Sequence, residues 1–228
     1  MIRSFALAAA LVLAPPATAF AQTSGDWSFA LGAGSDNRSK DASKSRGDPF
    51  VFGLAEWSSE DGVFYAGPSF ETIESSTGSD LELDLNGGIR RDLAGFEVDF
   101  NVAHKWQVGA DDGEDADAWE FTADITRAIG PAEAGLQLQH SPDGTGDTRA
   151  WTWVAANIAW AFTDKISGDA SLGRREQDAS VDYTGWNVGM TYAATPNLDV
   201  DLRYHDTDAD PSNPQYASAL VATVTAYF

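Results

Sequence analysis

Apolar and polar residues alternate one by one through much of this chain, and this alternation restricts its fold more than any other feature. Trp27, Phe29 and Leu31, for example, are separated by Ser28 and Ala30. A two-residue period is typical of β-strands that have one apolar and one polar face. The clearest segments are 27–33, 81–86, 96–102, 119–126, 132–139, 165–172, 186–192, 198–205 and 220–228. We therefore expect an all-β fold.

Three further segments have strand-like composition but no clear apolar face: 50–57, 63–72 and 150–162. Pro68 lies within the second of them and cannot donate a backbone hydrogen bond to a neighbouring strand. We expect that strand to be bulged or distorted there. With these three, the sequence predicts twelve strands.

The connections between these strands alternate between long and short. The long ones are 35–48, 74–79, 108–117, 141–148, 174–180 and 206–215, and the short ones are 58–62, 91–95, 129–131, 163–164 and 195–197. Long external loops and short periplasmic turns are typical of outer-membrane β-barrels. The pattern predicts an antiparallel, up-and-down transmembrane barrel with both ends of the chain on the short-turn side.

The first 21 residues have the features of an export signal. Arg3 precedes an apolar stretch of ten residues, 5–14, and Ala19-Phe20-Ala21 fits an A-x-A cleavage site. The alternative, a transmembrane anchor, needs about 20 apolar residues. We expect a cleaved signal peptide at 1–21 and a single barrel domain at 22–228, located in the outer membrane of a Gram-negative cell.

A soluble β-barrel or sandwich is the alternative fold, because its strands also alternate but direct their apolar face inward. Aromatic residues at the ends of the predicted strands favour the membrane barrel, where such residues form interfacial girdles. A terminal Phe228 on the last strand favours it as well. The two folds make opposite predictions for Leu83, Phe100 and Phe121, which would face lipid in one and form a central core in the other.

Composition excludes several functions. The chain has no cysteine, so disulfides and thiolate metal sites are absent. Its formal net charge is -21, which opposes the binding of nucleic-acid phosphates. We therefore expect no nucleic-acid partner. The predicted barrel implies outer-membrane lipid and small hydrophilic solutes as partners. The oligomeric state stays open.

If the apolar faces meet lipid, the opposite faces line the lumen. Ten acids fall on those faces against three bases, a balance of about -7 that requires a wet interior. The expected lining residues are Glu82, Asp84, Glu97, Asp99, Lys105, Glu120, Asp124, Glu133, Asp169, Asp199, Asp201 and Arg203, and Lys165 is the third base. Acidic linings attract cations. We predict a narrow pore for passive diffusion of small hydrophilic solutes, with cations favoured; a non-conducting barrel that acts through its external loops is the alternative.

The first long loop is basic, unlike the rest of the chain. It contains Arg38, Lys40, Lys44 and Arg46 within Ser35–Pro49. Opposite charges attract strongly where water is restricted. We therefore consider that this loop folds inward and narrows the lumen, with a solvated external loop as the alternative.

This loop also carries a family resemblance. SDNRSKDASKSRGDPFVFG (Ser35–Gly53) resembles the segment after the first strand in the TorF family of porin-like proteins, which reads S-D-Y-R-F-R-G-x-S-Q-S-x-G-x-P. GVFYAG, LELDLNGGIRRDLAGFEVDFNV, WEFTADI and HSPD are similar to later segments of that family. Residues 37 and 39–41 depart from its pattern. The resemblance implies an outer-membrane porin-like barrel and specifies no solute.

An enzyme and a metal site are weaker alternatives. A barrel hydrolase needs a histidine beside a polar partner, and His205 with Asp201 is the pairing that the strand faces allow. His104 and His140 fall on the lipid-facing set. The acidic loops 111–117 and 206–210 offer oxygen ligands for Ca²⁺ or Mg²⁺ but lack EF-hand spacing. We expect no catalytic residue, no metal and no cofactor.

Overall fold

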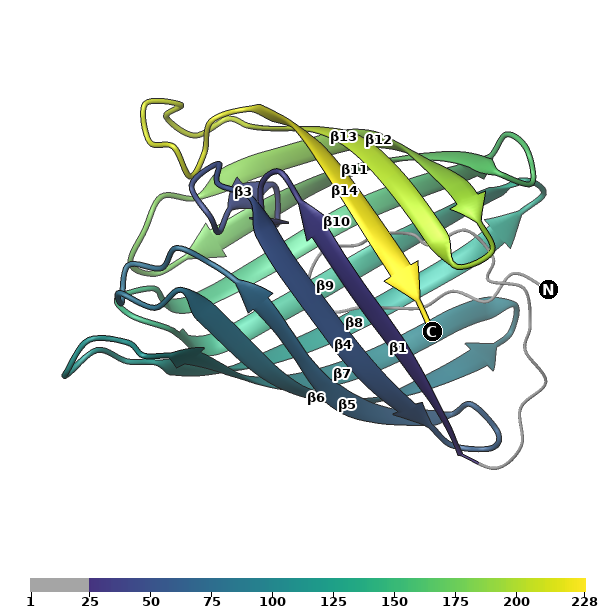
Figure 1. Cartoon of the computed structure of the whole chain (residues 1–228), viewed down its shortest axis with the longest axis horizontal. Helices are drawn as coiled ribbons and strands as arrows, with labels where there is room; N and C mark the ends of the chain where they lie inside the picture. The colour runs from purple at the N-terminus through teal and green to yellow at the C-terminus, as the bar shows by residue number, and fades with distance from the viewer. Residues whose placement is uncertain (1–24) are drawn as a thin grey trace.

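The chain forms a closed antiparallel barrel of twelve strands in the computed structural model, which describes residues 25–228 (Figure 1). The expected signal peptide, 1–21, lies outside the described residues. The barrel strands are β1 (Asp26–Gly34), β4 (Phe50–Ser58), β5 (Phe64–Thr72), β6 (Leu81–Leu93), β7 (Phe96–Val108), β8 (Asp117–Ile129), β9 (Ala132–Gly144), β10 (Arg149–Ala161), β11 (Ile166–Gln177), β12 (Tyr183–Thr195), β13 (Leu198–Thr207) and β14 (Ala219–Tyr227).

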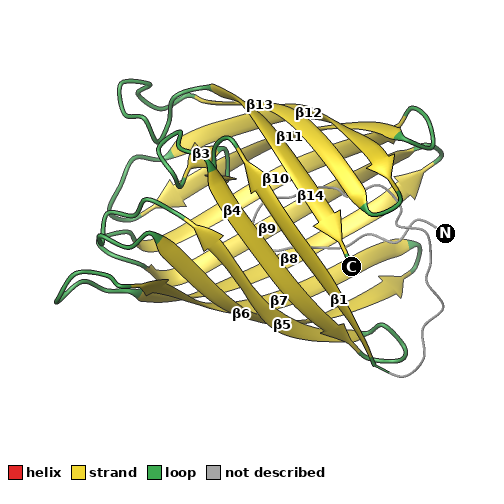
Figure 2. Cartoon of the chain, viewed as in Figure 1, coloured by secondary structure: helices red, strands yellow, loops and turns green. Residues whose placement is uncertain are grey.

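Each barrel strand pairs with the next one along the chain, and β1 pairs with β14 to close the barrel. The all-β, up-and-down fold is therefore confirmed, as is the number of strands. Two more short strands, β2 (Arg38–Ser39) and β3 (Ala42–Ser43), form a hairpin within the first long loop. Figure 2 shows the longer loops gathered at the left end of the barrel and the short turns at the right. We call these the long-loop end and the short-turn end.

Most of the large apolar side chains point outward. Leu83, Phe100 and Phe121 are 40%, 44% and 38% exposed, so they form no central core. Exposed aromatic residues lie near both ends of the strands, with Trp27 and Trp57 paired at the short-turn end and Trp119 at the long-loop end. An apolar outer surface flanked by aromatic residues suits a lipid bilayer. Among residues 25–228 no helix is long and apolar enough to cross a membrane.

Pro68 distorts its strand as expected, although it introduces no bulge. The pairing of β4 with β5 lapses opposite Gly67 and Pro68 and resumes in the same register at Trp57 and Ala66. On its other side Pro68 stays paired with Leu85 of β6. Because proline lacks an N–H, the missing hydrogen bond falls on the β4 side alone and the barrel stays closed.

Candidate functional site: the lumen and the first loop

Charged residues line the interior of the barrel, and the alternation of apolar and polar residues in the sequence predicted their inward direction. All twelve predicted lining residues lie on the inner faces of their strands, and most are buried. They are Glu82, Asp84, Glu97, Asp99, Lys105, Glu120, Asp124, Glu133, Asp169, Asp199, Asp201 and Arg203. The sequence pattern predicted that Lys165 lines the lumen as well. In the structure Lys165 is exposed in the turn before β11, so this prediction is wrong.

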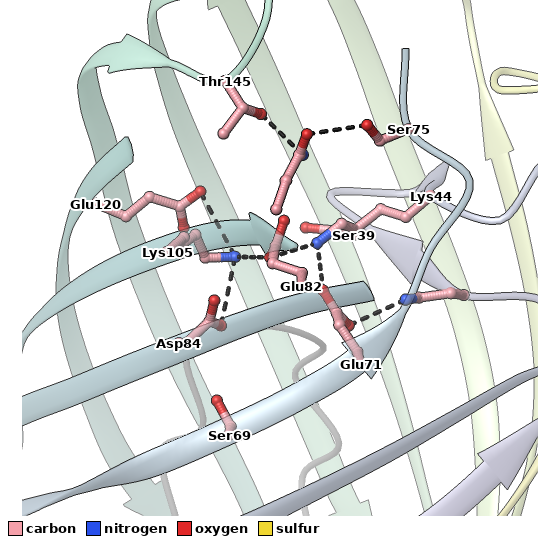
Figure 3. Close-up of polar contacts among 12 residues, drawn as sticks. Ser39, Lys44, Ser69, Glu71, Ser75, Glu82, Asp84, Lys105, Glu120 and Thr145 are labelled. Atoms are coloured by element: carbon pink, nitrogen blue, oxygen red, sulfur yellow. Dashed lines mark hydrogen bonds and ion pairs between the residues drawn. The ribbon is translucent and has the colours of Figure 1, made fainter. Parts of the chain in front are cut away.

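One cluster of charges centres on Lys105 of β7 (Figure 3). Its Nζ lies 2.6 Å from Glu82 Oε1, 3.6 Å from Asp84 Oδ2 and 3.8 Å from Glu120 Oε1. The amine is thus shared among carboxylates from β6 and β8. Buried carboxylates are costly without such partners, and so Lys105 stabilises this side of the wall.

A second cluster centres on Arg203 of β13. Its guanidinium binds both carboxylate oxygens of Asp169, with Nη2 2.7 Å from Oδ1, and contacts Asp201 Oδ2 at 3.2 Å. It also donates to Asn187 Oδ1 at 2.7 Å. The fork-shaped pairing of arginine with a carboxylate fixes these side chains against the wall.

A third cluster, which the sequence pattern does not indicate, centres on Arg90 of β6. Arg90 of β6 lies 3.0 Å from Asp99 Oδ2 and 3.5 Å from Glu56 Oε2, and its guanidinium stacks over the ring of Tyr65 at 4.3 Å. Tyr65 in turn donates to Asp99 Oδ1 at 2.6 Å. Gly87 and Gly88 precede Ile89 and Arg90 and have no side chain that would mark a face, so the inward direction of Arg90 was not apparent from the pattern.

The first loop turns into the barrel. At its base Lys44 forms ion pairs with Glu71 of β5 and, at 2.7 Å, with Glu82 Oε1 of β6. Within the loop Arg38 Nε binds Asp36 Oδ2 at 2.6 Å, and Arg38 Nη1 donates to the carbonyl of Asp41 at 3.0 Å. These contacts hold the β2–β3 hairpin in a fixed shape beside the β5–β6 wall.

The tip of the hairpin reaches the opposite wall. Asp41 Oδ1 lies 2.9 Å from His205 Nδ1 of β13 and accepts a hydrogen bond from Asn187 Nδ2 of β12 at 2.7 Å. The Tyr183 hydroxyl donates to the carbonyl of Lys40 at 2.9 Å. The loop therefore spans the lumen from β5–β6 to β12–β13, which the sequence pattern could not specify.

The two residues at the tip have unusual backbones and surroundings. Lys40 and Asp41 have φ angles of 54° and 65°, as the tight turn of this hairpin requires. The Lys40 amine lies 4.2 Å from the centre of the Trp151 ring. Burial lowers the pKa of Lys40 to about 7, although Glu120 opposes this effect. Arg46, in contrast, is exposed and pairs with Glu74 at 3.1 Å, so it lies outside the lumen.

A cavity lies between the hairpin and the β9–β14 wall. Its volume is about 100 Å³, which is enough for several water molecules. Charged residues of the loop and of the Arg203 cluster line it, together with Trp153 and Phe50. Trp153 belongs to a buried aromatic group with Trp151, Tyr183 and Tyr216. This group makes the inner face of β10 apolar, which is why the face of that strand was ambiguous in the sequence.

The histidines give no support to a hydrolase. His205 pairs with Asp41 of the loop rather than with Asp201, whose Oδ2 accepts from Thr191. His104 and His140 point outward, His104 between Trp106 and Trp119. Within residues 25–228 no group of three or more histidine or acidic side chains is arranged to hold a metal ion.

The sequence matches the model of one protein family over residues 19–228: Gcw_chp, described as a bacterial protein of unknown function. The chain belongs to this family. The match does not identify the TorF family specifically, so that resemblance stays a prediction. No curated protein matches the chain.

Solved structures with a similar fold are outer-membrane porins and channels. The KdgM porin superposes with a TM-score of 0.61 at 9% identity, covering 88% of this chain and 99% of its own. The NanC porin gives 0.59 at 7% identity, covering 89% and 100%. The COG4313 outer membrane channel from Pseudomonas putida F1 gives 0.58 at 12% identity, covering 92% and 97%. At these identities the likeness concerns the fold, and that fold is porin-like.

Proposed function

We propose that this protein is an outer-membrane porin through which small hydrophilic solutes diffuse passively, with cations favoured. The observation that carries the proposal is a closed barrel with an apolar outer surface and a charged inner one. A charged interior of this kind holds water, whereas a sealed barrel of eight strands is filled by side chains. In the proposed orientation the long-loop end is external and the short-turn end faces the periplasm.

The charges near the short-turn end support the preference for cations. In the described part of the chain, the buried and half-buried charges on the inner faces near that end include six acids and one base. They are Glu56, Glu97, Asp99, Asp124, Glu133, Asp199 and Arg90. Toward the long-loop end Lys105 and the basic loop offset most of the acids, and Arg203 is paired with Asp169 and Asp201. The excess negative charge is therefore concentrated where the pore would open to the periplasm, and it attracts cations.

The test is a planar-bilayer recording with refolded protein. Under a KCl gradient we expect single-channel steps with a reversal potential that favours K⁺. A variant with Glu97→Gln, Asp124→Asn and Glu133→Gln should lose much of this preference, whereas Asp112→Asn in an exposed loop should keep it. A preference for Cl⁻ would overturn the cation assignment, and the absence of steps would select a non-conducting barrel.

The first loop is proposed as the constriction of this pore. Its contacts with both walls of the lumen support that role. Deletion of residues 38–46 should raise the single-channel conductance, because the part of the first loop that crosses the lumen is removed. An unchanged conductance would favour a loop that has no effect on passage.

A further inference from the structure

The outer surface of the barrel carries two arginines near its short-turn end, Arg91 of β6 and Arg127 of β8. Both side chains are exposed, and each residue lies two positions before the end of its strand. They share the face that directs leucine and isoleucine outward. An arginine on the lipid face costs little near the interface and much more at the middle of the membrane. The two arginines therefore lie at the depth of lipid headgroups.

No acid accompanies these arginines on the outer strand faces at this end of residues 25–228. The acids of β6, β7 and β8 near this end lie on the inner faces. Asp61, in the turn between β4 and β5, acts on Arg91 through its charge without forming an ion pair. Its carboxylate instead accepts hydrogen bonds from Ser59 Oγ at 2.7 Å and from the backbone N–H of Val63 at 3.1 Å. This patch of the outer surface is thus positive, although the chain as a whole has a net charge of -21.

The strand register brings the two arginines to either side of β7. Arg91 is paired with Val98 of β7, and the guanidinium carbon of Arg127 lies 4.9 Å from the ring centre of Phe96, also on β7. An arginine that serves only to reach water extends its charged group away from the apolar surface. Arg127 instead leans over β7, the strand that separates it from Arg91. Because neighbouring strands lie about 4.8 Å apart, the two backbones are about 10 Å apart across the sheet, which leaves room for one headgroup between the side chains.

We propose that Arg91 and Arg127 together bind the phosphate of an anionic glycerophospholipid, whose acyl chains lie along the apolar outer faces of β6, β7 and β8. Guanidinium groups bind phosphate oxygens through paired N–H donors, and basic clusters at a membrane interface recognise anionic headgroups. A zwitterionic headgroup would bring its own ammonium beside two cations. The site goes beyond the proposed function, because it concerns the lipid surface and is the same whether or not the lumen conducts.

The test counts and ranks bound lipids by native mass spectrometry of the folded protein in detergent. Dioleoyl phosphatidylglycerol and dioleoyl phosphatidylcholine are titrated separately, so that the acyl chains are matched and the headgroup alone differs. We expect one phosphatidylglycerol to bind about tenfold more tightly than phosphatidylcholine. Equal affinities for the two lipids would overturn the proposal. Displacement of phosphatidylglycerol by inorganic phosphate at the same concentration would assign the site to free phosphate and overturn the lipid.

A double variant, Arg91→Gln with Arg127→Gln, tests the position of the headgroup. It should lose the preference for phosphatidylglycerol and still fold, since no ion pair is broken and a neutral side chain is tolerated at the interface. The matched control is Arg174→Gln, which removes an arginine from the outer face of β11 at the long-loop end, where it lies 3.7 Å from Asp182 Oδ2. This control should keep the preference of the wild type. An unchanged preference in the folded double variant would overturn the site.

Discussion

Gly185 of β12 determines whether the tip of the first loop can dock. A Cβ atom at this position would lie 2.7 Å from Asp41 Cβ and 2.8 Å from Asp41 Oδ2. Non-bonded carbon atoms prefer about 3.5–4.0 Å. In Gly185→Val the tip would have to retreat by about 1 Å or more, and we expect it to leave the β12–β13 wall.

The cost follows from the two contacts that this retreat breaks. Asp41 would lose its hydrogen bonds with His205 at 2.9 Å and with Asn187 at 2.7 Å. Hydrogen bonds to charged groups contribute about 1.5–3 kcal/mol each, so docking would weaken by about 3–6 kcal/mol. That shift is worth at least a hundredfold in the equilibrium between docked and undocked loop, since about 1.4 kcal/mol corresponds to a factor of ten.

The assay is single-channel conductance in KCl. Gly185→Val should conduct more than the wild type, because the tip of the first loop no longer lies across the lumen. The matched control is Gly87→Ala on the outer face of β6, where the nearest atoms lie 3.8 and 3.9 Å from the added Cβ. Equal conductance in wild type and Gly185→Val would refute the idea that the docked loop limits passage.

The remaining predictions concern the wall, the loop and the lipid face. Lys105→Met leaves Asp84 and Glu120 without their ion-pair partner, while Glu82 keeps Lys44, and it should lower the free energy of unfolding in urea by about 3–5 kcal/mol, whereas Lys165→Met should change it by less than about 0.5. Because burial lowers the pKa of Lys40 from 10.5 to about 7, the undocked loop binds more protons between these values. Docking should therefore strengthen as pH rises from about 7 toward 10.5, so the conductance should fall over this range in the wild type and stay flat in Lys40→Met. Leu138→Arg, on the outer face midway along β9, should destabilise the protein in lipid vesicles by about 2–4 kcal/mol, and no change would contradict a lipid-facing position.

The strands could be predicted because each clear one has a single apolar face. Along β7, Phe96, Phe100 and Trp106 point outward, while Asp99 and Lys105 point inward, so a two-residue period is visible without any tertiary information. The pattern failed where both faces have the same character. β10 carries Val154 and Ile158 outside and Trp151 and Trp153 inside, and β4 directs Phe50 and Phe52 inward against Gly34 and Gly32.

The net charge of the lumen was harder to predict than the identity of the residues that line it. Counting acids on the clear strands gave a strongly negative interior, but it omitted Arg90 and the three bases that the loop brings inside, Arg38, Lys40 and Lys44. Ion pairs depend on which strands are neighbours across the barrel and on where a loop folds, and neither is encoded in local periodicity. The negative excess that remains is concentrated near the short-turn end.

The inward fold of the first loop depends on the basic residues of the loop, which are visible in the local sequence, and on the docking of its tip, which is not. Four bases in an acidic chain indicate an attraction to the lumen, and this much is legible in the sequence. The docking of the tip depends on Asp41, an acid, which contacts His205 at a separation of 164 residues and fits only because residue 185 has no side chain. The basic residues thus account for why the loop enters the barrel, and the acidic residue among them accounts for where it stops.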